Sequence, residues 1–150
     1  GDMELKELIN EKGVVFLECR EMKDTIRELT QKAFSLSLIN STENFETAIL
    51  NREELVSTGI GMGISIPHAK LKEIDKFFIV VGIAKKGLDW DSIDRKPVRA
   101  VFMIGGPENS QKEYLKILSK LILLLKNEER REKLFSAEKE SDIVEIFSEF

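Results

Sequence analysis

The 150-residue chain contains few of the residues on which many protein sites depend: one cysteine, one histidine and three prolines. The single cysteine, Cys19, cannot form an internal disulfide or a thiolate-rich metal site. Because the chain has only this one cysteine and one histidine, we expect no zinc centre and no other metal site. Apolar runs such as residues 121–125 are far shorter than the roughly 20 residues that cross a bilayer. We therefore expect no membrane insertion.

The charge balance is acidic, with 27 Asp and Glu against 23 Lys and Arg and a formal net charge of −4. Nucleic-acid binding generally needs a basic face, so this balance argues against it. The basic residues within 130–133 alternate with glutamates, which indicates a solvated helix face. The first residues show no basic stretch followed by an apolar core, so we expect no secretory signal and a cytoplasmic location. Gly1 and Asp2, before Met3, are expected to be a leftover of the expression vector.

Hydrophobic periodicity predicts helices that alternate with buried strands. Helices are expected over residues 3–10, 23–36, 108–126 and 128–135, and two more are expected to begin at Asn44 and Ser141. Strands are expected over residues 14–17, 77–84 and 98–104, with a turn at residues 85–87 and a stop at residues 105–107. The chain contains no linker composition. These patterns predict one domain over residues 3–150, an α/β sandwich with helices on both faces of a sheet.

The segment of residues 57–70, STGIGMGISIPHAK, contains the only histidine, His68. Its three alternating glycines allow positive φ angles or close approach of the backbone to a ligand. Pro67 fixes its own φ and holds the residue before it extended. We therefore expect His68 at the mouth of a strand, with the amides near Gly61 and Gly63 free to donate to an anion. The residues alone leave open a structural histidine and a loop that is simply packed on a strand.

A neutral imidazole is a good nucleophile near neutral pH. Because His68 is the only imidazole, no serine or cysteine triad can form, and the glycines match neither the dinucleotide nor the P-loop pattern. His68 itself is then the candidate that accepts an electrophile. The amide-lined loop and the nearby Arg52 favour an anionic one, and phosphoryl is the natural candidate.

Residues 50–70, LNREELVSTGIGMGISIPHAK, resemble the signature of enzyme IIA proteins of the fructose/mannitol type. These belong to the bacterial phosphoenolpyruvate-dependent sugar phosphotransferase system (PTS) and include a nitrogen-related branch. Residues 87–110 and the stretch from Tyr114 are similar to the same family. The resemblance implies a mixed central sheet flanked by helices, and a His68 that accepts phosphate from the phosphocarrier protein HPr and passes it to a IIB domain for sugar uptake. It also implies that Arg52 lies close to the phosphohistidine and that no cofactor takes part.

The chain departs from the family pattern at Tyr114, where members usually have a second histidine. Tyrosine can donate one hydrogen bond but carries no positive charge at neutral pH. It can equally be a helix residue that packs its ring on the core. This departure keeps an alternative open, in which the domain is a regulatory binding module that controls a transporter, a kinase or a transcription factor.

Overall fold

The computed structural model describes residues 3–150, so Gly1 and Asp2 lie outside the described residues. The helices are α1 (Leu5–Leu8), α2 (Met22–Ser35), α3 (Thr42–Leu55), α4 (Gln111–Leu125), α5 (Glu128–Ser136) and α6 (Glu140–Ile146), with a 3₁₀ turn η1 (Glu11–Gly13). The strands are β1 (Val14–Phe16), β2 (Gly59–Gly61), β3 (Ile64–Ser65), β4 (His68–Leu71), β5 (Phe78–Leu88) and β6 (Val98–Pro107).

The six strands form one mixed sheet in the order β1-β5-β6-β3-β2, and β4 also pairs with β6. The long strands β5 and β6 are antiparallel, β1 is parallel to β5, and β3 and β4 are both parallel to β6. β3 lies opposite Ala100 and Val101, and β4 begins opposite Ile104. One edge of β6 therefore holds two short strands end to end, and the second of them begins with His68.

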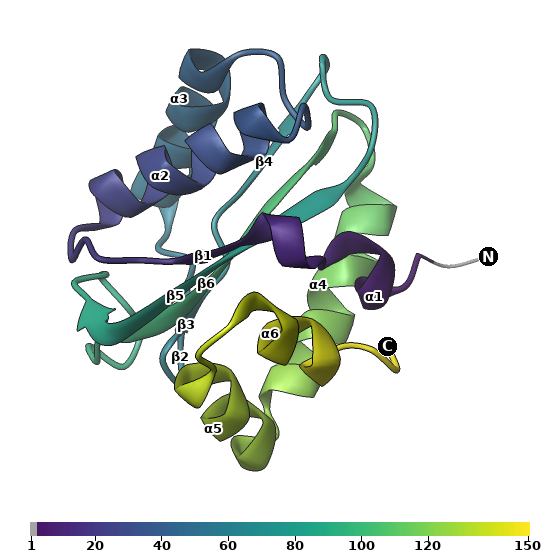
Figure 1. The fold of residues 1–150 in the computed structure, drawn as a ribbon. Coiled ribbons are helices and arrows are strands. Elements are labelled where there is room, and N and C mark those ends of the chain that lie inside the picture. Colours follow the sequence, from purple (N-terminus) through teal and green to yellow (C-terminus); the bar gives the residue numbers. More distant parts are fainter. Residues whose placement is uncertain (1–2) are drawn as a thin grey trace.

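Helices cover both faces of the sheet (Figure 1). α2 and α3 bury their apolar residues on one face, among them Ile26, Leu29, Phe45 and Ile49. α1, α4, α5 and α6 lie on the other face, where the buried side chains include Leu5, Leu121, Leu134 and Phe147. Each Å² of apolar surface buried on these faces stabilises the fold by about 25 cal/mol, and this burial holds the three layers together. The expected single-domain α/β sandwich with a mixed central sheet is confirmed.

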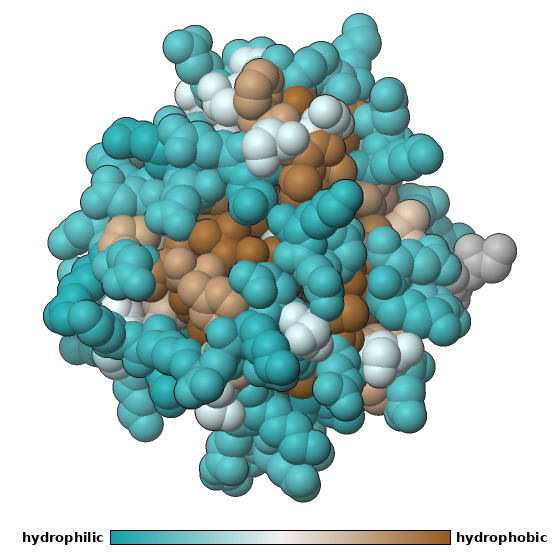
Figure 2. Space-filling view, viewed as in Figure 1, coloured by the Kyte–Doolittle hydropathy of each residue, from teal (hydrophilic) through white to brown (hydrophobic). Residues whose placement is uncertain are grey.

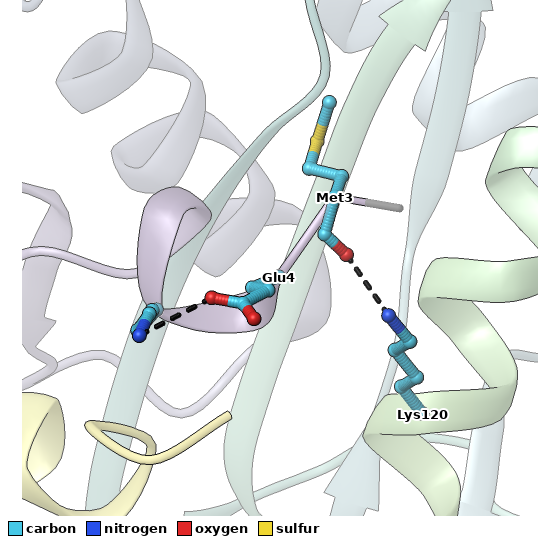
Figure 3. A network of polar contacts seen from close by, with 4 residues as sticks. Met3, Glu4 and Lys120 are labelled. Atoms are coloured by element: carbon cyan, nitrogen blue, oxygen red, sulfur yellow. Dashed lines mark hydrogen bonds and ion pairs between the residues drawn. The ribbon is translucent and has the colours of Figure 1, made fainter. Parts of the chain in front are cut away.

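The segment that contains α1 is attached to α4 and to the last residue of the chain. Lys120 Nζ donates to the Met3 carbonyl at 3.1 Å, and Glu4 forms an ion pair with Lys6 at 3.2 Å (Figure 3). The Leu5 N–H donates to the Phe150 carbonyl at 2.9 Å. Because the Glu4 and Lys6 side chains are about half exposed, their ion pair contributes little, and the buried Leu5 does more to hold the segment.

Polar side chains cover most of the face in Figure 2, with hydrophobic atoms visible between the helices. Within residues 3–150, no helix combines the length and apolar composition needed to cross a bilayer.

Two expected strand ends were wrong. β5 continues through residues 85–87 to Leu88, with Gly87 at a φ of 84° where the pairing with β6 becomes irregular. β6 continues through residues 105–107 because its glycines make room for aromatic rings. A Cβ at Gly105 would collide with the ring of Phe78, and one at Gly106 with the ring of Phe77.

Two expected helix caps were also wrong. The Ser41 hydroxyl accepts from the Asn44 N–H at 3.1 Å, so α3 begins three residues earlier than a cap at Asn44 would allow. α6 is preceded by Lys139, and Ser141 lies inside the helix. The carboxyl group of Asp142 instead accepts from the N–H groups of Glu138 and Lys139.

Candidate functional site

His68 is the first residue of β4, as expected for a histidine at the mouth of a strand. The carbonyl of Pro67 accepts from the Ile104 N–H at 2.9 Å, which fixes the backbone just before the histidine on β6. The backbone that leads to His68 is thus paired with β6 in β3, at Pro67 and in β4, and this pairing fixes the position of the imidazole. The residue does not belong to a free loop.

The imidazole of His68 is oriented by a backbone carbonyl. Its Nδ1 lies 3.1 Å from the carbonyl oxygen of Ile66. A carbonyl oxygen can only accept, so Nδ1 carries the proton and the neutral ring has its lone pair on Nε2. Burial lowers the pKa of His68 below 6.5; the Ile66 hydrogen bond opposes this, while the charges of Arg52 and Lys70 add to it. The ring is therefore neutral at pH 7, and its unprotonated Nε2 has the lone pair that a nucleophile needs.

Tyr114 lies beside His68, with the two ring centroids 4.7 Å apart and the rings tilted by 35°. It belongs to the first turns of α4 and is only 4% exposed. Burial raises the pKa of its hydroxyl to about 12, against the opposing effect of the Arg52 charge. The hydroxyl therefore keeps its proton at neutral pH and can donate. Tyr114, which stands in the sequence where family members usually have a second histidine, thus contacts His68. Its ring also packs on the core.

Two cations act on these rings. Arg52 comes from the last turn of α3, and its Nη1 donates to the Val56 carbonyl at 2.8 Å. Its charge lowers the pKa of both His68 and Tyr114, so it acts on both rings. Lys70 follows His68 by two residues in β4 and so points to the same face of the strand.

Lys70 and its partner were missed by the sequence reasoning. Its Nζ lies 5.0 Å from the centroid of the Tyr114 ring and donates to the side-chain oxygen of Gln111. The two-residue period of a strand, counted from His68, would have placed Lys70 on the histidine's face. No comparable signal marks Gln111, because its place beside Lys70 depends on the packing of α4.

Gly61 and Gly63 do not lie beside His68. Met62 and Gly63, with φ of 60° and 75°, form the two-residue turn between β2 and β3, typical of a type I′ hairpin. β3 begins opposite Ala100 and β4 opposite Ile104, about 13 Å further along β6 at 3.3 Å per residue. The expectation that their amides bind an anion at His68 is therefore wrong. Both glycines belong to the β2–β3 hairpin and lie outside the site.

Without the glycine amides, the site consists of the His68 imidazole, the Tyr114 phenol and the positive charges of Arg52 and Lys70. Within the described residues, no group of three His, Cys, Asp or Glu side chains is placed to hold a metal ion. The positive charges of Arg52 and Lys70, which both act on His68, favour an anionic group near the unprotonated Nε2.

A family model described as "Phosphoenolpyruvate-dependent sugar phosphotransferase system, EIIA 2" matches residues 7–150. The chain belongs to this family. Its EIIA fold therefore accounts for the mixed sheet with helices on both faces, and the resemblance drawn from residues 50–70 is confirmed.

Curated relatives of this EIIA chain include fructose-specific PTS proteins and nitrogen regulatory proteins. It is 36% identical over 148 residues to the PTS system fructose-specific EIIABC component of Bacillus subtilis, covering 98% of the chain but 23% of that protein. It is 38% identical over 102 residues to the PTS system fructose-specific EIIA component of Haloferax volcanii, covering 68% of the chain and 66% of the relative. The nitrogen regulatory protein of Bradyrhizobium diazoefficiens is 34% identical over 118 residues, which cover 79% of this chain and 76% of that protein. The chain thus spans less than a quarter of the Bacillus protein.

Solved structures carry the same EIIA fold. The nitrogen regulatory protein IIA-Ntr from Neisseria meningitidis superposes with a TM-score of 0.89 at 25% identity, covering 95% of this chain and 98% of that one. The complex of enzyme IIAMTL with phosphorylated enzyme IIBMTL from Escherichia coli gives 0.83 at 16% identity, with 95% and 98% covered. At that identity the second likeness speaks for the fold alone.

Proposed function

We propose that residues 3–150 form a cytoplasmic EIIA domain in which His68 accepts a phosphoryl group from HPr and passes it to a IIB partner during sugar uptake. The observation that carries the proposal is the His68 ring, held by the Ile66 carbonyl so that Nε2 is unprotonated, and near enough to Arg52 and Lys70 for both charges to lower its pKa. Membership of the EIIA family and the fructose-specific relatives supply the partner chemistry. The name of the Bacillus relative, an EIIABC component, joins the A part to B and C parts and supports a IIB acceptor.

The proposed step is an in-line displacement at phosphorus. The Nε2 lone pair of His68 forms a new N–P bond while the N–P bond of phosphorylated HPr breaks, and that bonding pair stays on the leaving imidazole nitrogen of HPr. The Nδ1 proton of His68 stays in place, and the Ile66 carbonyl stabilises the positive charge that the ring gains. Transfer to the IIB partner is the reverse displacement with a new acceptor. The covalent intermediate is a phosphohistidine.

The flanking side chains neutralise charge on the transferring group. We assign Arg52 as the main clamp, since its planar guanidinium matches phosphoryl oxygens, and Lys70 as a second positive charge. Tyr114 is assigned one neutral hydrogen bond to the phosphoryl group or to the ring. In this assignment Lys70 supplies a positive charge that Tyr114, unlike the family's usual second histidine, does not carry.

Phosphorylation by purified components tests the proposal. Incubation with phosphoenolpyruvate, enzyme I and the cognate HPr should add one acid-labile phosphate, seen by intact mass spectrometry. His68→Ala should gain none while keeping its fold by circular dichroism. Absence of the adduct with an active HPr would refute the carrier function.

A regulatory module is the second candidate, and a specific observation favours it. The chain is 34% identical to a nitrogen regulatory protein and superposes on IIA-Ntr with a TM-score of 0.89. Transfer onward separates the two functions. A carrier should lose its phosphate to a fructose-type IIB domain within the time of HPr transfer, whereas a regulator should accept phosphate and retain it when IIB is added.

A further inference from the structure

Glu53 is a buried acidic residue that the proposed phosphoryl transfer does not use. It lies in the last turn of α3, next to Arg52, and is 8% exposed. Its two carboxyl oxygens lie 3.3 and 3.1 Å from the backbone nitrogen of Thr58, and the Thr58 hydroxyl also donates to one of them. A carboxyl group buried at this position is thus satisfied by one residue, just before β2.

Thr58 connects Glu53 to His68 through hydrogen bonds. The Thr58 carbonyl accepts from the Ile66 N–H at 3.0 Å, and the Ile66 carbonyl accepts from Nδ1 of His68 at 3.1 Å. A series of hydrogen bonds therefore runs from Glu53 through Thr58 and Ile66 to the imidazole. Thr58 and Ile66 are 6% and 2% exposed, so water does not compete freely for these bonds.

The segment between α3 and β2 also holds Arg52, through a backbone carbonyl. Arg52 donates to the Val56 carbonyl, two residues before Thr58. The last turn of α3 therefore holds the segment of residues 56–58 at two points, through Arg52 and through Glu53. Movement of this segment would shift both the arginine and the carbonyl that orients His68.

We propose that Glu53 is a positioning residue for His68. By holding Thr58, it fixes the Ile66 carbonyl where it accepts the Nδ1 proton, and so keeps the neutral ring in the tautomer whose Nε2 is free to attack. Glu53 itself does not touch the phosphoryl group. The effect on rate rests on the proposed phosphoryl transfer, whereas the effect on the tautomer does not.

The tautomer can be read directly because His68 is the only histidine. Protein labelled with ¹⁵N in the imidazole gives one pair of ring nitrogens, and the wild type should show a protonated Nδ1 and an unprotonated Nε2 above pH 7. In Glu53→Gln an amide NH₂ replaces one acceptor opposite the Thr58 N–H, so the Nε2-protonated form should rise to a measurable fraction. Glu54→Gln is the matched control, since Glu54 is the exposed neighbour on the same helix, and it should leave the tautomer unchanged.

Phosphate acceptance from HPr is measured on the same proteins. Glu53→Gln should accept about five- to tenfold more slowly, the scale of one hydrogen bond, while Glu54→Gln matches the wild type. If Glu53→Gln does not fold by circular dichroism, the pair Thr58→Val and Thr58→Ser makes the test, because only the serine keeps the hydroxyl. Valine should shift the tautomer and slow acceptance, and serine should restore both.

The outcomes separate the two proposals. An unchanged tautomer and a rate within twofold of wild type in folded Glu53→Gln, or in Thr58→Val, would overturn the positioning role. A wild type that accepts no phosphate, with a tautomer that still shifts in Glu53→Gln, would refute the carrier function and leave the positioning of His68 standing.

Discussion

Removal of the Arg52 guanidinium is the sharpest perturbation of the proposed site. One of its N–H groups is held by the Val56 carbonyl, so the guanidinium is preorganised near His68 and Tyr114. A unit charge within about 4 Å of a phosphoryl oxygen contributes ~4 kcal/mol at an effective dielectric constant of 20. Loss of one preorganised donor at comparable sites costs roughly 3 to 4 kcal/mol. Arg52→Ala should therefore accept phosphate a hundred- to a thousandfold more slowly, while it folds normally.

The assay is single-turnover transfer from phosphorylated HPr, followed by quenched mass spectrometry. Because the Arg52 charge lowers the pKa of His68, the variant also raises that pKa, and a smaller fraction of its rings is neutral at low pH. Measurement at about pH 8 removes this difference, since an imidazole of ordinary pKa near 6.5 is neutral there in both proteins. Arg52→Lys should recover only part of the loss, because an ammonium lacks the planar fork. An Arg52→Ala rate within a few-fold of wild type at that pH would refute the clamp.

Three further predictions concern the second ring, the pH response and the sheet. Tyr114→Phe should slow acceptance about tenfold or less, the scale of one neutral hydrogen bond, and Tyr114→His should match or exceed wild type in the same assay; a collapse in both would contradict this. Because the pKa of His68 is lowered in the fold, the unfolded chain binds its proton first as pH falls below 6.5, so wild type should lose urea stability relative to His68→Gln between about pH 7 and 5. Gly105→Ala should lower the free energy of unfolding by about 1 to 3 kcal/mol, since its Cβ meets the Phe78 ring; an unchanged melting temperature would show that the ring moves aside freely.

The sequence predicted the layers well because long periodic segments report burial directly. The pattern of α4 predicts seven residues on its buried side: Tyr114, Leu115, Ile117, Leu118, Leu121, Ile122 and Leu125. The structure buries Tyr114, Ile117, Leu121 and Leu125 and partly buries Leu118 and Ile122, whereas Leu115 is 48% exposed. Glycine was the weak point, because the same residue type can break a strand or clear space within it. Gly105 and Gly106 read as a stop, and only the positions of the Phe77 and Phe78 rings explain why the strand continues.

The site was predictable in part. The motif around Pro67 placed His68 at a strand mouth, and the structure brings Arg52 and Tyr114 to it. The glycine loop was placed wrongly because adjacency in sequence says nothing of which end of β6 the hairpin meets. Lys70 needed the strand register, and the role of Glu53 needed hydrogen bonds that depend on the fold of three segments.

The origin of the site residues has a consequence for how the domain loses activity. Arg52 comes from α3 on one face of the sheet, Tyr114 from α4 on the other, and His68 from a short strand that pairs with β6 between them. An intermediate that keeps only one helical layer would lack either the clamp or the phenol. The capacity to accept phosphate should therefore disappear in one cooperative step with the whole domain, and the β4 amides that donate to β6 should exchange with solvent at the rate set by global unfolding.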